Sequence, residues 1–354
     1  MGRCATAGTC LRALVKMAIP LCREAQRQCP RTGPGRPPVI PDWVLAVLIM
    51  VGVLKRKKTK SAQYRFLERH RRQLQQWLGT GLFPARSTYF DRYRRAQRLY
   101  EEAIRLQGLK AIEEGLADPT IVAVDKSMIE ALGPQWHKKD RQANRIPAGL
   151  HGVDRDSTWG FSKHDGWVQG YSYEVVVTAT ANGTVWPLLA SVATASTSEH
   201  TTFGNKIAQL PETTRYVTAD SGYDNNAYGE AIEWTEKDQR TGRRFLCPEN
   251  RRNAKKQRPT IRLSDQTRQR RQQRRAFLRS PRGRKLFRRR SQSVEPFNEW
   301  FKSLFELDRK VWHRGLANNQ TLILAALFAY QVLLRYNHRQ GGTNGQVRWI
   351  LDQL

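Results

Sequence analysis

The chain has 354 residues and a formal charge of +30 at pH 7, because 61 Lys and Arg residues stand against 31 Asp and Glu residues. A hydrophobic fraction of 39%, with 10 Trp, 11 Tyr and 12 Phe, excludes a disordered tail protein and predicts about two or three folded domains. Repulsion among so many positive charges destabilises the compact state of an isolated chain, and the basic excess therefore predicts a polyanionic partner.

Residues 1–41 are expected to form an N-terminal segment that ends in a hinge. Charged residues and a proline interrupt its apolar residues, so we expect no signal peptide. Four of the five cysteines lie here, with spacings that match no zinc motif. Five prolines between Cys29 and Pro41 predict the hinge. Because the longest apolar runs, 43–54 and 322–334, are shorter than the roughly 20 residues that cross a bilayer, we expect no membrane partner. The unmatched cysteines favour a reduced, cytoplasmic protein.

Residues 42–118 are predicted to form a helical, helix-turn-helix-like DNA-binding region. Helices are expected over 42–54, 61–78 and 87–109, with Asp42 as the cap of the first. Basic residues alternate with apolar ones in the third helix, which suits a helix that enters a DNA groove. The same pattern is typical of an ordinary helical subdomain with a solvated basic face. Helical periodicity does not separate these two interpretations.

The periodicity then changes and predicts an α/β domain over 119–337, followed by a polar tail over 338–354. The short apolar run 120–125 is typical of a strand that is buried on both faces. Two later strands are separated by Asn182-Gly183, the dipeptide that best suits a two-residue hairpin turn. Strands and helices alternate afterwards, which indicates a mixed sheet. After the first strand, the expected elements are strands at 171–181 and 184–193, a helix at 199–210, a strand at 215–220, a helix at 225–237 and a strand at 244–247.

Residues 251–290 form a strongly basic window ahead of the last predicted helices. This window holds 18 Lys and Arg residues and a single acidic residue, Asp265. One interpretation is a solvated or disordered segment. The other is a phosphate-binding insertion that becomes ordered on nucleic acid.

Three acidic residues stand at the ends of the predicted elements. Asp125 ends an apolar strand, and Asp220 ends another strand 95 residues later. Glu295 is placed in the first turn of a helix over 293–307, where Pro296 is tolerated. Carboxylates at such positions suit Mg²⁺ or Mn²⁺, and two ions about 3.5–4 Å apart can bind the attacking and departing oxygens of a phosphoryl transfer.

Two neighbouring acids provide the alternatives to this assignment. An aspartate after a strand, taken alone, is more often a turn former or a helix cap than a metal ligand. Asp224 is expected to have that role, as the cap of a helix that begins at Asn225. Glu299 lies one helical turn from Glu295 and is the rival third acid.

Three segments resemble the acidic motifs of DDE-type insertion-sequence transposases: Val124-Asp125-Lys126-Ser127, Thr218–Asp224 and Arg290–Lys302. In that family an RNase H-like domain carries Asp, Asp and Glu as metal ligands, and an insertion often separates the second Asp from the Glu. The resemblance covers roughly 119–337 and implies an RNase H-like catalytic domain with a basic insertion at 251–290. It also implies three metal ligands: Asp125, Asp220 and Glu295.

The third motif of the family commonly has Tyr and Arg before the Glu and a Lys seven residues after it. Lys302 stands at the position of that Lys. Arg290 lies five residues before Glu295, whereas Ser291 occupies the usual Arg position and Arg288 the usual Tyr position. The resemblance implies DNA contacts from four basic residues: Arg288, Arg289, Arg290 and Lys302.

The family implies a DNA transposase with a specific sequence of reactions. Such an enzyme binds the terminal inverted repeats of its element, cuts phosphodiester bonds with two Mg²⁺ ions, or Mn²⁺ in their place, and joins the 3′-OH ends to target DNA. A homodimer on DNA is expected because two ends are processed, and the protein is expected to associate with the nucleoid. Two alternatives stay open, namely a catalytically inactive nucleic-acid-binding protein on the same scaffold and an RNase H-like nuclease without strand transfer.

The long connection after the first strand contains three tryptophans, Trp136, Trp159 and Trp167. They are expected to pack within the connection, and the alternative is stacking on bases near a cleaved DNA end. The aspartates of the same connection, among them Asp154 and Asp156, lack the glutamate that completes an EF-hand. They are expected to form the loop that leads into the hairpin.

Overall fold

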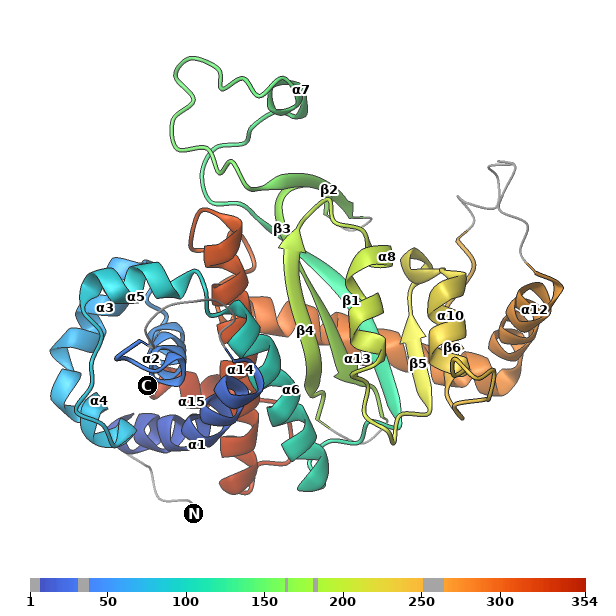
Figure 1. Ribbon diagram of the computed structural model, residues 1–354, viewed down its shortest axis with the longest axis horizontal. Coiled ribbons are helices and arrows are strands. Elements are labelled where there is room, and N and C mark those ends of the chain that lie inside the picture. Colours follow the sequence, from blue (N-terminus) through green and yellow to red (C-terminus); the bar gives the residue numbers. More distant parts are fainter. Residues whose placement is uncertain (1–6, 31–37, 163–164, 181–183, 251–263) are drawn as a thin grey trace.

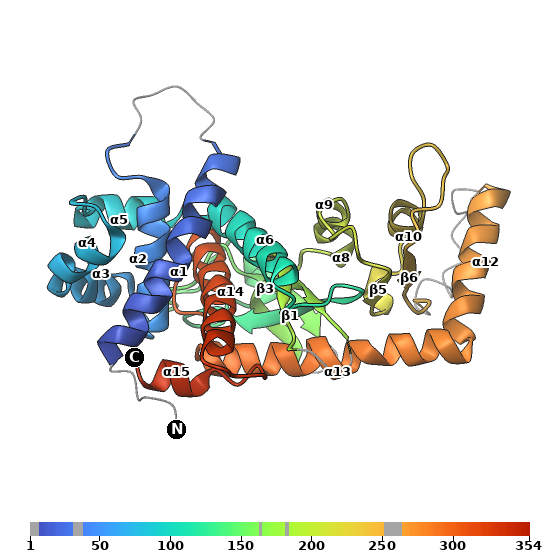
Figure 2. The same ribbon diagram turned by 90° about the horizontal axis from the view of Figure 1, so that it is seen from below.

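The computed structural model describes residues 7–30, 38–162, 165–180, 184–250 and 264–354. A helical N-terminal part lies beside a mixed β-sheet, and the C-terminal helices connect the two parts (Figures 1 and 2).

The N-terminal helices are arranged around an apolar helix that has no polar face. α2 is buried from Trp43 to Leu54, and an evenly apolar helix must be covered on all sides. α1, α3 and the C-terminal helix α14 (Leu316–Arg339) supply most of this cover. The six helices of this part are α1 (Ala7–Gln28), α2 (Asp42–Leu54), α3 (Lys60–Arg69), α4 (Arg71–Leu78), α5 (Arg86–Tyr93) and α6 (Gln97–Glu113).

Two of the predicted N-terminal helices are each broken into two. The helix expected over 61–78 is divided at His70 into α3 and α4, and the helix expected over 87–109 is divided into α5 and α6. Periodicity missed these breaks because each piece keeps an apolar side that faces the core. Asp42 is the first helical residue of α2 and not its cap, since its carboxylate pairs with Arg92.

The sheet has six strands in the order β2-β3-β1-β5-β6, with β4 paired to β3. β1 is antiparallel to β3 and parallel to β5, so the prediction of a mixed sheet is confirmed. β2 and β4 pair with the edge of β3 that is opposite to β1. The strands are β1 (Ile121–Glu130), β2 (Thr158–Ser162), β3 (Gly166–Thr178), β4 (Pro187–Thr194), β5 (Tyr216–Ala219) and β6 (Arg244–Leu246).

Several predicted elements around the sheet differ in detail. β3 and β4 form the expected antiparallel pair, whereas the turn Asn182-Gly183 lies outside the described residues. The helix expected over 199–210 consists of α8 (Glu199–Thr202) and α9 (Gly204–Ile207). Asn225, not Asp224, caps α10 (Asn226–Glu233), because the Asn225 side chain accepts a hydrogen bond from the backbone N of Ala227 at 2.9 Å.

The basic window departs furthest from expectation. Its first part, 251–263, lies outside the described residues, and the rest forms α12 (Asp265–Arg279) and the start of α13 (Pro281–Leu304). Ser280 caps α13 and Pro281 takes the first helical position, which is where proline is best tolerated. The helix that carries Glu295 therefore begins far earlier than predicted, and Pro296 lies in its interior.

Pro296 removes one backbone hydrogen bond from the middle of α13, which is normally unfavourable. The helix persists because Val294, Phe297 and Phe301 are buried on one side of it, each at 3% exposure or less. α13 packs on β1, β5 and β3 and runs beneath the sheet toward α12 (Figure 2).

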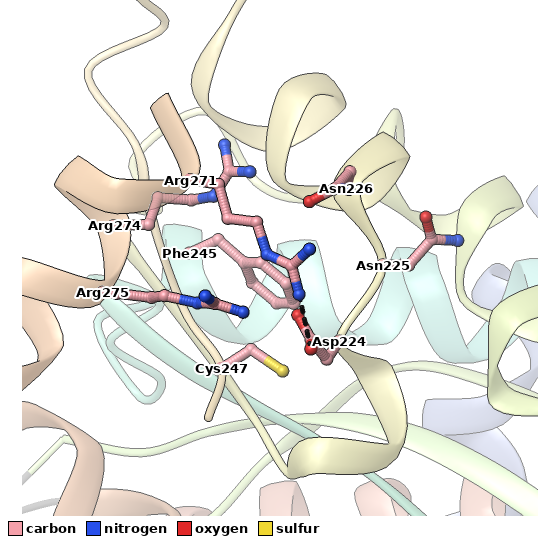
Figure 3. Close-up of a pocket in the computed structure, with 8 residues that line it drawn as sticks. All are labelled: Asp224, Asn225, Asn226, Phe245, Cys247, Arg271, Arg274 and Arg275. Carbon is pink, nitrogen blue, oxygen red and sulfur yellow. Dashed lines mark hydrogen bonds and ion pairs between the residues drawn. The ribbon is translucent and has the colours of Figure 1, made fainter. Parts of the chain in front are cut away.

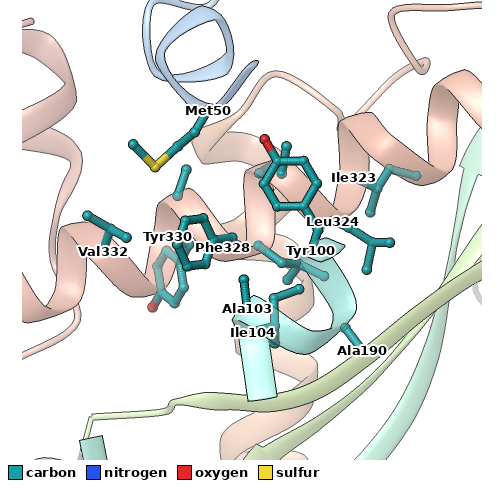
Figure 4. Packing of buried hydrophobic residues seen from close by; sticks show 14 of the residues in the cluster. Met50, Tyr100, Ala103, Ile104, Ala190, Ile323, Leu324, Phe328, Tyr330 and Val332 are labelled. Carbon is teal, nitrogen blue, oxygen red and sulfur yellow. The ribbon is translucent and has the colours of Figure 1, made fainter. Parts of the chain in front are cut away.

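α14 is the central core helix of the molecule. Figure 4 shows Phe328 of α14 among Met50 of α2, Tyr100 and Ile104 of α6 and Ala190 of β4. Length and composition would also allow α14 to cross a membrane, but 78% of its most apolar stretch is buried inside the protein. The expected polar tail also contributes to the core, since α15 (Arg348–Asp352) buries Ile350 and Leu351.

Candidate active site

Asp125 was expected to end its strand, but it lies in the middle of β1, which continues to Glu130. Both of its carboxylate oxygens are held by α13. Oδ1 accepts a hydrogen bond from Arg290 at 2.8 Å, and Oδ2 accepts one from the Asn298 amide at 2.9 Å. Burial raises the pKa of Asp125, the charge of Arg290 opposes this rise and the charge of Asp220 adds to it, so that the pKa is about 6. Asp125 is therefore a carboxylate that requires a cation beside it to stay ionised at neutral pH.

Asp220 directly follows β5, the parallel neighbour of β1. Its Oδ1 accepts a hydrogen bond from the backbone N of Gly222 at 2.8 Å, which caps the turn η1 (Ser221–Tyr223). The turn-forming role and a role in the site coincide here, because the charge of Asp220 also acts on Asp125 and on Arg290. A Cβ at Gly222 would lie 2.9 Å from Asp220 Oδ1, so any larger residue there would displace the Asp220 carboxylate.

Glu295 contacts the same arginine as Asp125. Arg290 and Glu295 are joined by an ion pair of 2.8 Å, and the Arg290 side chain is 13% exposed whereas that of Glu295 is 53% exposed. Burial alone would lower the pKa of Arg290, but the charges of Asp125, Asp220 and Glu295 outweigh it and raise that pKa. One guanidinium is thus paired with Asp125 and Glu295, and the charge of Asp220 acts on it as well.

The oxygen donors of the three carboxylates suit a divalent cation, whereas the observed positions of the side chains suit the Arg290 guanidinium. Hard oxygen donors suit Mg²⁺ and Mn²⁺, and the three acids already attract one common cation. Within the described ranges, no three His, Cys, Asp or Glu side chains are grouped so that they could hold a metal ion. Asp125 and Glu295 pair with Arg290 instead.

Asn298 and Tyr173 are site residues that the sequence interpretation missed. The Tyr173 hydroxyl donates to Asn298 Oδ1 at 3.0 Å, and the Asn298 amide in turn donates to Asp125. Asn298 is 6% exposed on the apolar side of α13, between Val294 and Phe301. A polar residue on that buried stripe was the available signal, because a buried amide needs a partner.

A second buried network supports the turn after Asp220. Glu174 of β3 is 2% exposed, and it accepts hydrogen bonds from Lys206 Nζ at 2.7 Å and from the Tyr223 hydroxyl at 2.9 Å. Thr202 donates to the same carboxylate at 2.5 Å. Tyr223 lies three residues after Asp220, so these contacts tie the Asp220 turn to the centre of the sheet.

The other predicted DNA-binding residues do not reach the acids. Arg288 is exposed, and Arg289 contacts Gln292 on its own helix at 3.3 Å. Lys302 lies two helical turns beyond Glu295 and is half-buried. Of the four basic residues predicted to contact DNA, the structure brings only Arg290 to the carboxylates.

Much of the charge on α12 is neutralised within the protein. Arg271 pairs with Asp224 at 3.2 Å, Arg274 pairs with Glu230 at 3.0 Å, and Arg270 pairs with Glu230 at 2.7 Å. Figure 3 shows Arg271 and Arg274 in a small pocket beside the Asp220 turn. These contacts dock α12 on α10 and β6, so its arginines are less available to DNA than their number predicts.

A family model described as the transposase DDE domain matches residues 116–332, which is more than half of the chain. The protein belongs to the DDE transposase family. Its sheet order is typical of an RNase H-like fold, so the predicted fold class is confirmed. Membership implies a divalent metal ion and DNA as a partner. No curated protein matches the chain.

Proposed function

We propose that this DDE transposase mobilises an insertion sequence. It would bind the element's terminal inverted repeats, cut phosphodiester bonds at its ends and join the 3′-OH ends to target DNA, acting on the nucleoid in the cytoplasm. The observation that supports this proposal is the junction of β1, β5 and α13, where Arg290 joins Asp125 to Glu295 beside the charge of Asp220.

Asp125, Asp220 and Glu295 are the residues that would hold Mg²⁺ or Mn²⁺. When bound, these ions would activate the attacking oxygen and neutralise charge on the departing one. Within the chain, Asn298 keeps Asp125 oriented through its 2.9 Å contact. Arg290, once released from the acids, would be free to pair with a DNA phosphate, for which a guanidinium is well suited.

The first half of α13 supports a path for the DNA backbone toward the acids. Arg284 and Arg288 are exposed, and their spacing places both on the side of α13 that carries Glu295. We therefore assign backbone affinity to this half of α13 more than to α12, whose arginines are paired internally. Recognition of the element's ends is assigned to residues 42–118.

This division can be tested through the salt dependence of DNA binding. Each phosphate neutralised steepens log K against log salt by about 0.9 on duplex DNA. Arg284→Gln combined with Arg288→Gln removes two such contacts and should reduce the slope by about 1.8. The matched change of Arg271→Gln with Arg274→Gln should leave the slope nearly unchanged. The reverse result would place the backbone contacts on α12.

The catalytic assignment is tested on a plasmid that carries the DNA flanking this gene. Asp125→Asn, Asp220→Asn and Glu295→Gln should each abolish Mg²⁺-dependent cutting and joining, while DNA affinity stays equal or rises because a negative charge is lost. Glu299→Gln and Asp224→Asn are the matched controls and should remain active. Activity in Glu295→Gln with loss in Glu299→Gln would move the site by one helical turn.

The same experiment separates the alternative functions. Cutting without joined products would identify a nuclease without strand transfer. Binding by the wild-type chain without any cutting would identify a catalytically inactive DNA-binding protein, in which Arg290 permanently neutralises the acids. We also propose a homodimer on paired ends, and sedimentation of the protein with and without end DNA tests that assembly.

A further inference from the structure

The β2–β3 ribbon carries an exposed pair of aromatic side chains. Phe161 and Trp167 are cross-strand partners with ring centroids 5.4 Å apart, and they are 48% and 60% exposed. The Lys138 ammonium of α7 (Lys138–Gln142) lies 5.3 Å from the centre of the Trp167 ring. Large aromatic residues are mostly buried, so a paired and exposed set beside a cation marks a binding surface.

The structure separates Trp167 from the two other tryptophans of this connection. Trp136 is 3% exposed, and its indole N–H donates to the Arg145 carbonyl at 2.8 Å. The Trp159 indole donates to the Trp136 carbonyl at 2.8 Å. The predicted packing role therefore holds for Trp136 and Trp159, which fix the base of the ribbon, whereas Trp167 projects outward from it.

Trp167 stands on the same face of β3 as the site. Strand alternation places Trp167, Tyr173 and Val175 on one face, and Tyr173 contacts Asn298 while Val175 pairs with Asp125. Eight residues separate Trp167 from Val175, which is roughly 26 Å along a strand. At about 3.4 Å per base pair, this distance corresponds to roughly eight base pairs of duplex.

The surroundings of the aromatic pair carry the charge that suits DNA. Lys138 and Lys139 are exposed in α7, and the connection that holds α7 projects beyond the rest of the molecule next to β2 and β3 (Figure 1). Two acidic residues of this connection are engaged elsewhere. Asp154 accepts from the Tyr171 hydroxyl at 2.8 Å, and Asp156 accepts from the backbone N of Leu316 at 2.8 Å. The Lys138 cation therefore lies beside the apolar rings, and Asp165, two residues before Trp167, is an exposed acid of the ribbon.

We propose that Phe161, Trp167 and Lys138 bind an unpaired nucleobase of the DNA, about eight base pairs from the reacting phosphate. Aromatic rings stack on any base, and a neighbouring lysine neutralises the adjoining phosphate, so this contact favours distorted DNA over particular sequences. The inference rests on the proposed function, because the chain must act on DNA. It adds a site, at a distance from the acids, that binds distorted DNA more tightly than fully paired DNA.

The test compares two labelled duplexes of the same random sequence by fluorescence anisotropy at fixed salt. One duplex is fully paired, and the other has a small mismatch bubble about eight base pairs from one end. Stacking contributes about 1–3 kcal/mol per base, so Trp167→Ala should weaken binding to the bubble duplex by roughly 5- to 150-fold. Binding to the paired duplex should change little, and Trp167→Phe should retain most of the preference.

Trp349→Ala is the matched control, because Trp349 is 43% exposed on α15 and lies outside the ribbon. It should bind both duplexes as the wild type does. Equal binding of the bubble duplex by the wild type and Trp167→Ala would refute the inference, and so would an equal loss on both duplexes. A lower dimer fraction with unchanged DNA affinity would instead identify the pair as an interface between copies. Failure of the wild type to bind either duplex would refute the proposed function itself.

Discussion

Replacement of Arg290 by glutamine tests whether its guanidinium is the internal counter-ion of the acids. The Arg290–Glu295 pair contributes at most about 1 kcal/mol, because Glu295 is 53% exposed. The Arg290–Asp125 pair is different, since its side chains are 13% and 16% exposed. Removal of one partner from such a buried pair costs roughly 3–5 kcal/mol. Asp125 can escape part of this cost by taking up a proton, so we expect Arg290→Gln to lose about 3 kcal/mol at neutral pH without metal.

The same change should strengthen metal binding, because the ion no longer competes with the guanidinium. Each 1.4 kcal/mol is tenfold in affinity, so a competition of about 3 kcal/mol predicts up to roughly 100-fold tighter Mn²⁺ binding. The assays are urea unfolding by circular dichroism with and without MgCl₂, and titration calorimetry with Mn²⁺ in the absence of DNA. MgCl₂ should stabilise Arg290→Gln more than it stabilises the wild type.

Arg289→Gln is the matched control, since Arg289 precedes Arg290 and its side chain contacts Gln292 of its own helix. It should match the wild type in both assays. If Arg290→Gln is as stable as the wild type and binds Mn²⁺ no more tightly, Arg290 does not compensate the acids. If neither protein binds Mn²⁺, the assignment of the three acids as ligands is wrong.

Three further changes test individual contacts. Gly222→Ala places a methyl group 2.9 Å from the present Asp220 Oδ1, so cleavage should fall by about 100-fold while the melting curve is preserved. Unchanged cleavage would show that Asp220 tolerates displacement. Burial lowers the pKa of His313 to about 3, so its stabilisation is complete above about pH 6.5 and is lost as pH falls toward 3. Between about pH 6.5 and pH 3, the unfolding free energy of His313→Asn should therefore fall by up to about 5 kcal/mol less than that of the wild type. An equal fall in both proteins would assign this pH dependence to other groups. Tyr173→Phe leaves Asn298 Oδ1 without its donor and should cost about 1–3 kcal/mol in urea unfolding, whereas no loss would make that hydrogen bond dispensable.

The two aspartates could be predicted from sequence because each directly follows a clear apolar run. Asp125 and Asp220 follow Val124 and Ala219, which are paired in adjacent parallel strands. Parallel neighbours bring equivalent positions side by side, so two apolar runs that each end in Asp already place the acids together. That the two strands are parallel neighbours is a long-range contact, which the structure supplies.

The start of α13 could have been read from Ser280-Pro281, but the basic composition of the window concealed it. A serine cap followed by proline at the first helical position is a strong start signal. The high charge indicated a solvated segment instead, because composition cannot show which arginines have acidic partners. The contacts of Arg271 with Asp224 and of Arg274 with Glu230 join residues more than 40 positions apart, and no local pattern predicts them.

The position of Arg290 follows from the true start of the helix. Once α13 is known to begin at Pro281, Arg290, Val294, Phe297 and Phe301 fall on one side of it at helical spacing. The last three are buried, so an arginine in register with them must face the sheet and must find acids there. Arg288 instead shares the exposed side with Glu295. Arginines two positions apart on one helix thus have opposite surroundings, and we propose that Arg290 contacts DNA only after its release from the acids.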